Sequence, residues 1–399
     1  MSQILTVSCK LTTTPQQVQK LDAVMKAFAR CCEFVHHNTP EKLHNRMAVQ
    51  SLIYKEARAE SGLGSQHTIH AIRRVCGARK VAKQKGSKVR GFAPTSAGYD
   101  ARTFTFREDT WSVSLTMLKG REKFPLHIGN YQRHLLGGQD PKSAVLSKRR
   151  DGSFYLQIQV ETDTPQFAPT SEVLGVDLGR TDIAVTSDGE EFCGQQLKQV
   201  RDRYAKTRAS VQRKASKGTR SSRRRCRQLL TRLSGRERRF QAQVNHTISS
   251  RLIKKARATG MAIALEDLTG IRERTNQMPR SKTERRRSNS WAFYQLRLFL
   301  TYKCLGSGVK LILVNPAYTS QACAKCCHIH PVWGESYRQG KKFACGHCGN
   351  RCDADLNGAK NIATLGRIVN SPEGSGWACS LADHVRLRAI EGSALCSAG

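Results

Sequence analysis

The chain has 399 residues, and its 67 Lys and Arg against 31 Asp and Glu give a formal net charge of +36 at pH 7. Such an excess repels itself in a compact protein unless a polyanion neutralises it, and nucleic acid is the polyanion that matches many cations best. A membrane surface is the rival, but the sequence contains neither a basic amphipathic helix nor an apolar run of roughly 20 residues.

The first residues, Met1 to Thr6, lack the basic-then-apolar order of a secretory signal peptide. We therefore expect a soluble, cytoplasmic protein that has no membrane partner. In that compartment the 15 cysteines are expected to be thiols, some of them bound to metal, and not a disulfide framework. The length allows two or three domains with cores of their own.

Residues 1–165 begin with a predicted strand and a helix start. Thr14 is placed as the N-cap, Pro15 as the first helical residue and Gln17 as the partner that closes a capping box. Helices are expected at about 15–35, 41–60 and 66–84, and strands at 4–12, 103–106, 111–115, 144–147 and 154–160. A helical block between an isolated first strand and later strands predicts a β-barrel with a helical insertion at about 14–100.

Residues 166–170, with two prolines nearby, are the predicted domain boundary. Beyond them, apolar strands alternate with helices, which indicates an α/β domain. The strands are expected at 173–177, 183–185, 261–265 and 309–314, and the helices at 198–258, 291–305 and 356–368. Trp291 and Tyr294 are expected to be core residues of their helix. The last thirty residues have weak periodicity and are expected to form a flexible tail.

Three acidic residues stand where elements of this second region end or begin. Asp177 and Glu266 each end an apolar strand, and Asp355 lies near the start of the last helix. Any one of them alone is better explained as a solvated or turn-capping acid. Together they predict converging carboxylates, which repel one another unless they hold cations. The usual solution is a pair of Mg²⁺ ions about 3.5–4 Å apart that catalyses phosphodiester hydrolysis. The neighbours Asp267 and Asp353 are expected to lie beside the ligands or in solvent.

Cys323 and Cys326 form one CxxC pair, and Cys345 and Cys348 form another after eighteen intervening residues. Two such knuckles can complete a tetrahedron around one structural Zn²⁺, as in a zinc ribbon. The alternative is that cytosolic thiols have this spacing by accident. Further candidate ligands lie nearby, so the set of four cysteines is the simplest assignment and not the only one. They are Cys327, Cys352, His328 and His347.

Four segments resemble the signatures of TnpB proteins, which are RNA-guided nucleases of bacterial insertion sequences and relatives of type V CRISPR effectors. They are Leu174–Arg180, Ala264–Leu268, Asn315–Cys323 and Asp353–Ile362. The resemblance is specific from about residue 171 to 364, and before that it concerns the layout only. This sequence departs from the pattern at Cys327, where glycine is usual, and at Gly358, where alanine is commoner.

The resemblance implies a multidomain α+β and α/β architecture. Residues 1–165 would be a wedge-type β-barrel with a helical recognition insertion. An RNase H-like (RuvC) nuclease domain would follow in two parts, with a zinc ribbon inserted between them. The ranges are 166–317 for its first part, with a basic helical insertion at about 198–258, then 318–350 for the ribbon, 351–368 for its last part and 369–399 for the tail. Asp177, Glu266 and Asp355 match the family's catalytic, metal-binding carboxylates.

The resemblance also implies an RNA-guided, Mg²⁺-dependent DNA endonuclease encoded by a transposable element. A bound guide RNA would select double-stranded DNA, and the protein would read a short flanking motif. Three alternatives are a catalytically silent guided repressor, a transposase of the same fold and a guide-independent nuclease; the oligomeric state is left open. Exposed arginines are expected to contact nucleic acid, with 201–239 lining a heteroduplex channel. The clusters are Arg223, Arg224, Arg225, Arg236, Arg238, Arg239, Arg285, Arg286 and Arg287.

Overall fold

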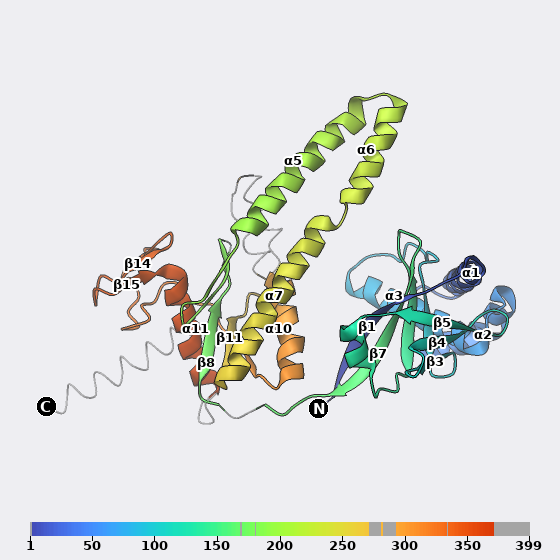
Figure 1. Cartoon of the computed structure of the whole chain (residues 1–399), viewed down its shortest axis with the longest axis horizontal. Helices are drawn as coiled ribbons and strands as arrows, with labels where there is room; N and C mark the ends of the chain where they lie inside the picture. Colours follow the sequence, from blue (N-terminus) through green and yellow to red (C-terminus); the bar gives the residue numbers. More distant parts are fainter. Residues whose placement is uncertain are drawn as a thin grey trace. The chain divides into compact units, whose positions relative to one another are not determined.

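A computed structural model describes residues 2–167, 170–179, 181–270, 281, 293–332 and 334–370. The chain divides into two compact units, Met1–Asp163 and Thr164–Gly399 (Figure 1). None of the helices in the described ranges has the length and apolar character needed to cross a membrane. Of the predicted tail, residues 369 and 370 end the last helix, and the remainder lies outside the described residues.

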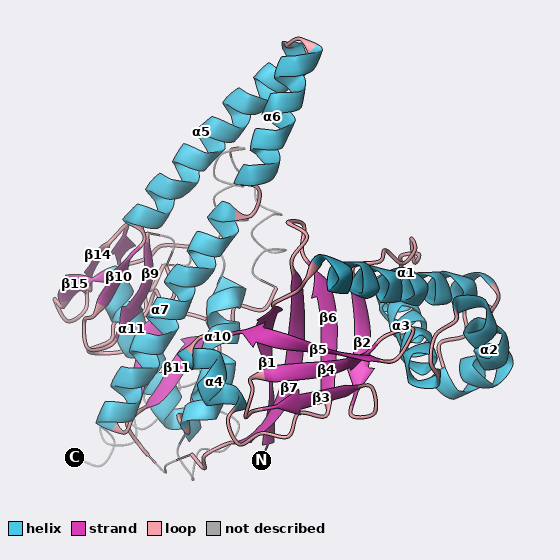
Figure 2. Ribbon diagram, turned by 45° about the vertical axis from the view of Figure 1, so that its right-hand side comes forward, coloured by secondary structure: helices cyan, strands magenta, loops and turns pink. Residues whose placement is uncertain are grey.

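The first unit is built on a seven-stranded antiparallel sheet with the order β2-β6-β7-β1-β5-β4-β3 (Figure 2). Two long strands, β1 and β7, pair along nearly their whole length at its centre. The described pairings leave β2 and β3 as edge strands, so they do not by themselves show a closed barrel. The strands are β1 (Ser2–Leu11), β2 (Ser96–Asp100), β3 (Phe104–Arg107), β4 (Ser112–Thr116), β5 (Arg121–His127), β6 (Ser143–Lys148) and β7 (Phe154–Asp163).

Three helices lie between β1 and β2 in the chain, and their apolar faces share one core with the sheet. The predicted capping box is confirmed, because Thr14 Oγ1 accepts from the Gln17 backbone N–H and the Gln17 side chain accepts from Thr14 N–H. The second helix begins later than expected because Asn45 caps it. The helices are α1 (Pro15–His37), α2 (Arg46–Ser61) and α3 (Ser65–Gln84), with the short α4 (Asn130–Leu136) between β5 and β6.

The second unit contains a five-stranded mixed sheet with the order β10-β9-β8-β11-β12. Antiparallel pairing joins β10 to β9 and β9 to β8, whereas β8, β11 and β12 are parallel. The carboxyl ends of three strands therefore meet at one edge of the sheet. The strands are β8 (Val173–Asp177), β9 (Asp182–Thr186), β10 (Glu191–Cys193), β11 (Ala262–Glu266) and β12 (Leu311–Val314).

Helices cover both faces of this sheet. Leu174 and Val176 pack with α7 (Arg236–Thr259) and α10 (Phe293–Ser307), whereas Val173 and its neighbours pack with α11 (Ala354–Asn370). Successive strand residues point to opposite faces, and every position from 173 to 176 is buried. Burial on both faces explains why the strand is a continuous apolar run.

The basic stretch predicted as helical contains three helices. Two of them, α5 (Gln195–Lys217) and α6 (Arg220–Leu233), lie side by side and extend away from the sheet in Figures 1 and 2. No residue of α6 is buried, so this helix does not contribute to the core. The third helix, α7, returns the chain to the sheet.

The expectation that Tyr294 is a core residue is wrong. Its neighbours Phe293, Leu296 and Leu300 are buried in α10, but Tyr294 is 73% exposed because it lies on the opposite face of the helix. The apolar run continues around the helix, so its sequence does not distinguish the buried face. Trp291 lies outside the described residues.

Candidate functional site

The sheet register places two of the predicted carboxylates side by side. Parallel pairing joins Leu265 of β11 to Val176 of β8, so the next residue on each strand is Glu266 and Asp177. Both are the last residues of their strands and both are partly buried. In each strand an acid follows a run of apolar residues. Because the two strands are parallel and in this register, the two acids lie next to each other.

The third carboxylate comes from the first turn of α11, which crosses β8 closely. A Cβ on Gly175 would lie 2.1 Å from the backbone oxygen of Ala359 in α11, so only glycine allows this approach. A Cβ on Gly366 would lie 2.7 Å from the side chains of Val173 and Ala264. The close packing of α11 brings its buried Asp355 to the edge of the sheet that carries Asp177.

The three carboxylates interact electrostatically. Burial, followed by the negative charges of Glu266 and Asp355, raises the pKa of Asp177 to about 8. Burial also raises the pKa of Glu266, against a hydrogen bond from Thr319 and the positive charge of Arg338. Because the site disfavours three simultaneous negative charges, a bound cation would stabilise the fully ionised form.

Two side chains from outside the strands contact this acidic cluster. Arg338 Nη2 donates to Asp355 Oδ1 at 2.7 Å, and its positive charge opposes the rise in the pKa of Asp177 and of Glu266. The buried Thr319 hydroxyl donates to Glu266 Oε1 and lies 2.9 Å from the Pro316 carbonyl. Arg338 is thus the cation that faces the carboxylates in this structure, and Thr319 orients one of them.

The two neighbouring acids have local structural roles. Asp353 Oδ1 accepts from the backbone N–H groups of Asp355 and Leu356, at 2.8 and 3.1 Å, and so caps α11. Asp267 Oδ1 accepts from the backbone N–H of Thr269 and from Arg297, which lies 2.6 Å away. Both acids already use an oxygen in these contacts.

The four predicted cysteines converge. Their sulfur atoms all lie within 4.8 Å of one another, with Cys323 and Cys348 at 3.7 Å and Cys326 and Cys345 at 3.7 Å. A hydrogen bond from the backbone of Asn350 lowers the pKa of Cys348, whereas burial raises the pKa of Cys326, so the four thiols share their protons unequally when no cation is bound. Four thiols at this spacing fit a closed site such as that of Zn²⁺. Within the described ranges, no other group of three or more His, Cys, Asp or Glu residues is as tightly spaced.

The two knuckles have the same backbone geometry. In the first, Cys327 N–H donates to the Cys323 carbonyl at 2.8 Å, and in the second, Gly349 N–H donates to the Cys345 carbonyl at 3.0 Å. Cys327 has φ of 59° and Gly349 has φ of 72°, so both adopt the left-handed conformation. Cys327 therefore occupies a turn position that favours glycine and lies outside the four-sulfur group.

The other three candidate ligands also lie outside the sulfur group. Cys352 belongs to β15 and its sulfur lies 3.8 Å from the side-chain nitrogen of Asn350. His328 and His347 stack on each other with ring centroids 4.5 Å apart, one from each knuckle. A three-stranded sheet adjoins the cluster, and its last strand, β15, ends at Asp353. Its strands are β13 (Arg338–Gln339), β14 (Lys342–Ala344) and β15 (Arg351–Asp353).

Two family models match parts of the chain. Residues 156–269 match a model described as a probable transposase, and residues 293–362 match the Cas12f1-like TNB domain. A putative RNA-guided DNA endonuclease from Streptomyces pristinaespiralis is 30% identical over 295 residues, which cover 73% of this chain and 68% of that protein. The chain belongs to the TnpB family. A TnpB-like protein from Methanocaldococcus jannaschii is 33% identical over 177 residues, which are 44% of this chain and 59% of that protein.

The TnpB-family chain also resembles solved structures of guided nucleases. It superimposes on the protein of a Cas12f1–sgRNA–target DNA complex with a TM-score of 0.61, over 91% of this chain and 84% of that one. The sequence identity in this comparison is 13%, so the similarity is one of fold. The mixed α/β fold with a cysteine cluster that could hold a metal such as zinc is thereby shown for the chain.

Sequence reasoning missed the side chains that fix the TnpB-family ribbon to the sheet and to α11. Asn357 donates to the Ala322 carbonyl at 2.7 Å, and Asn361 donates to the same carbonyl at 2.8 Å. Lys341 forms an ion pair with the buried Asp182 of β9. The two asparagines are one helical turn apart in the motif that carries Asp355, and this spacing was the available signal.

The predicted arginine clusters that the structure describes belong to helices that carry none of the three carboxylates. Arg223, Arg224 and Arg225 belong to α6, and the second cluster belongs to the first turn of α7; all six side chains are exposed. The second cluster consists of Arg236, Arg238 and Arg239. The third cluster, Arg285, Arg286 and Arg287, lies outside the described residues.

Proposed function

We propose that the chain is an RNA-guided, Mg²⁺-dependent DNA endonuclease encoded by a transposable element, active in the bacterial cytosol or nucleoid. It cleaves DNA that matches a bound guide RNA next to a short flanking motif. The observation that carries the proposal is the convergence of Asp177, Glu266 and Asp355 in a TnpB-family chain. Relatives whose names indicate RNA-guided DNA endonucleases support it, as does the net charge of +36.

The acidic cluster fits divalent metal. Its carboxylates are hard oxygen ligands, and a cation would relieve their mutual repulsion. Their oxygen atoms are farther apart than the four cysteine sulfurs that could bind a single ion. A pair of Mg²⁺ ions would supply an activated water and stabilise the leaving oxygen. Asp177, Glu266 and Asp355 would hold the ions, Thr319 orients Glu266, and Arg338 is placed to meet a phosphate once metal replaces it at Asp355.

The domain assignment is part of the proposal. The unit Met1–Asp163 would be the wedge-type β-barrel, and α1 to α3 would be its recognition insertion. The five-stranded sheet with α7, α10 and α11 would be the RuvC-like nuclease domain, and residues 318–353 would be the zinc ribbon. The exposed arginines of α6 and of the first turn of α7 would contact the backbone of the RNA–DNA heteroduplex, since guanidinium groups pair well with phosphates.

The test is cleavage with the RNA that the protein carries. The protein is purified with its co-purifying RNA, that RNA is sequenced, and a matched plasmid is offered with Mg²⁺. Wild type is compared with Asp177→Ala and with Asp267→Ala, a control that removes a neighbouring acid held by Arg297. We expect wild type and the control to cut matched DNA only, and Asp177→Ala to bind it uncut.

Each other result contradicts the proposal in a distinct way. Binding of matched DNA without cleavage by wild type would indicate a guided repressor. Joining of DNA ends would indicate a transposase. Cleavage that ignores the RNA sequence would indicate a guide-independent nuclease.

A further inference from the structure

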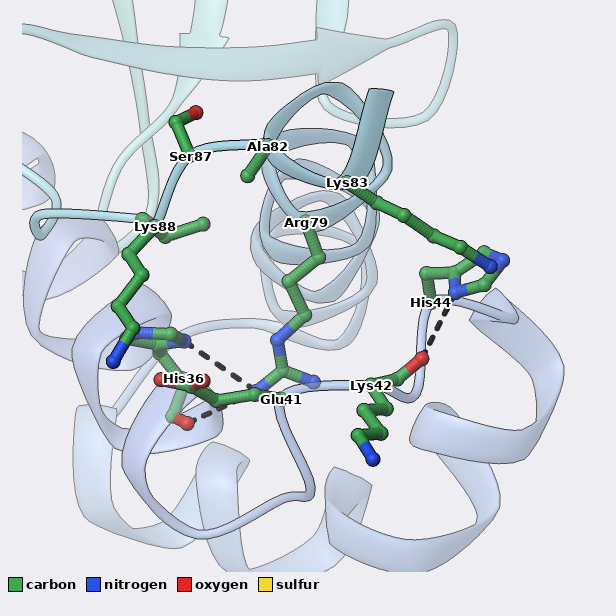
Figure 3. A pocket seen from close by; sticks show the side chains of 10 residues that line it. His36, Glu41, Lys42, His44, Arg79, Ala82, Lys83, Ser87 and Lys88 are labelled. Atoms are coloured by element: carbon green, nitrogen blue, oxygen red, sulfur yellow. Dashed lines mark hydrogen bonds between the residues drawn. The ribbon is translucent and has the colours of Figure 1, made fainter. Parts of the chain in front are cut away.

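The first unit contains a cavity that the proposed nuclease chemistry does not use. It has a volume of about 380 Å³ and lies between α1, α3 and the segments that follow each of them (Figure 3). Small-molecule sites in proteins span roughly 300–1,000 Å³, so the cavity is large enough for a ligand. Glu41 is the single acid among the residues that line it. The basic lining residues are Lys42, Arg79, Lys83 and Lys88, joined by His36 and His44.

Arg79 is a buried cation at the wall of this cavity. It is 4% exposed, and its guanidinium donates to the carbonyls of His36, Thr39 and Leu43 at 2.9, 3.1 and 2.9 Å. In the described part of the chain no carboxylate lies within ion-pair distance of Arg79, and its buried Nε has no hydrogen-bond partner. Glu41, which lines the same cavity, acts on Arg79 electrostatically without forming an ion pair with it. The wall therefore carries a buried cation that no carboxylate of the described residues pairs with, and its Nε lacks a hydrogen-bond partner.

Three lysines line the same cavity as Arg79. Figure 3 shows the Lys83 side chain reaching toward His44 and the Lys88 side chain toward His36, on opposite sides of the guanidinium. All three lysines, including Lys42, are exposed, and none is paired with a carboxylate of the described residues. Cations that line one cavity repel one another, and an anionic ligand would relieve this repulsion.

A purely structural role explains part of this arrangement. The carbonyls that Arg79 contacts belong to the end of α1 and the segment after it, so the guanidinium stabilises a helix C-terminus. That role leaves Nε without a partner. It also gives no reason for Lys83 and Lys88 to line the same cavity. The cavity and its rim therefore require a second explanation.

We propose that this cavity binds the phosphate of a nucleotide unit. Arg79 and the lysines would contact the phosphate, and the sugar and base would occupy the remaining volume against Ala82 and Val89. The same chemistry has two sources, a free mononucleotide or one nucleotide of an RNA strand. The inference does not rest on the carboxylate site, because binding can be measured without cleavage.

The experiment uses the full chain, freed of nucleic acid by high salt. Binding of labelled AMP is measured by equilibrium dialysis, and binding of a short single-stranded RNA by fluorescence anisotropy. Lys83→Glu with Lys88→Glu is compared with Lys26→Glu and Lys119→Glu, a pair of exposed lysines of the same unit that do not line the cavity. Both double variants change the net charge equally. We expect AMP affinity to fall about tenfold or more in the cavity variant only.

The results separate the two sources and the failure of the proposal. If RNA affinity also falls in the cavity variant alone and AMP competes with RNA, the nucleotide belongs to a strand. If AMP binding falls while RNA binding is unchanged, the ligand is a free nucleotide. Equal AMP affinity in the two double variants, or no AMP binding by wild type at millimolar concentration, would overturn the proposal.

Discussion

The second unit contains two clusters of like-charged ligands that are organised in opposite ways. The four cysteine sulfurs lie within 4.8 Å of one another, and each knuckle is fixed by backbone hydrogen bonds of its own turn. The three carboxylates come from two strands and a helix, are more widely spaced, and face Arg338 and Thr319. A closed group holds a metal for stability, whereas an open group leaves room for substrate.

This difference predicts that removing a ligand has opposite effects on stability at the two sites. At the cysteine cluster, metal binding and folding of the ribbon are the same process. At the carboxylates, burial and the charges of Glu266 and Asp355 raise the pKa of Asp177, so the ligands destabilise one another when no cation is bound.

Cys345→Ser should unfold the ribbon. Structural zinc contributes on the order of 10 kcal/mol in small domains, so losing one of four thiolates should release the metal. We expect bound zinc, measured by mass spectrometry, to fall from one equivalent to near none, with new protease cleavage between residues 318 and 353. Cys352→Ser is the matched control, because that sulfur lies outside the four-sulfur group. Equal zinc loss in both variants would show that Cys352 is a ligand.

Asp177→Asn should abolish cleavage and yet stabilise the metal-free protein. Losing metal contacts worth several kcal/mol slows cleavage by roughly a thousandfold or more. Burial, followed by the charges of Glu266 and Asp355, raises the pKa of Asp177, so an ionisable carboxyl there destabilises the metal-free protein. Its replacement by a neutral amide should raise the free energy of unfolding in EDTA by about 1 kcal/mol. Thermal melting in EDTA and in Mg²⁺ measures the second effect.

Asp267→Asn is the control for this variant. Asp267 is paired with Arg297 and hydrogen-bonded within its turn, so its loss should lower stability slightly and leave cleavage within a few-fold of wild type. If Asp177→Asn destabilised the metal-free protein as Cys345→Ser does, the contrast between the two clusters would be wrong.

Arg338→Ala should strengthen metal binding at the carboxylates. Arg338 is partly exposed and paired with Asp355, so a metal ion must displace it, at a cost of about 1 kcal/mol after solvent screening. We expect the Mn²⁺ concentration for half-saturation, followed by electron paramagnetic resonance, to fall roughly threefold to tenfold. Arg351→Ala, an exposed cation of the same ribbon, should leave it unchanged. A weaker affinity in Arg338→Ala would mean that Arg338 supports the metal-binding geometry.

The two clusters also differ in how far sequence could predict them. The spacing of Cys323, Cys326, Cys345 and Cys348 encodes two local turns, so the convergence of their sulfurs follows from short-range geometry. The apolar runs before Asp177 and Glu266 allowed both strands, and the acid that ends each of them, to be predicted. Their proximity depends on the parallel register of β8 and β11, which is set by packing across the whole sheet.

The ion pairs that Arg338 and Lys341 form could not be predicted from the sequence. Arg338 and Lys341 lie between the two cysteine pairs, and nothing in their sequence context distinguishes them from solvent-exposed basic residues. Asp182, the partner of Lys341, is distant in sequence, and Asp355, the partner of Arg338, lies on a different element; tertiary packing brings both pairs together. The exposed position of Tyr294 was missed for a related reason, since an apolar run does not reveal which face of a helix is covered.

Cys327→Gly should stabilise the zinc-bound ribbon. Cys327 holds φ of 59° in a turn where the second knuckle has Gly349, and a left-handed conformation costs a residue with a Cβ roughly 1–2 kcal/mol. Glycine's greater freedom in the unfolded chain offsets part of this, so we expect a gain of about 1 kcal/mol in chemical denaturation.

Gly349→Ala is the reverse experiment at the equivalent turn. A Cβ there meets no atom within 4 Å, so any loss of stability reports backbone conformation alone. We expect a loss of about 1 kcal/mol, with zinc content unchanged in both variants. Zinc loss in Cys327→Gly would instead assign that sulfur to the metal, and the first knuckle would then differ from the second in its ligands and not only in the residue at its turn.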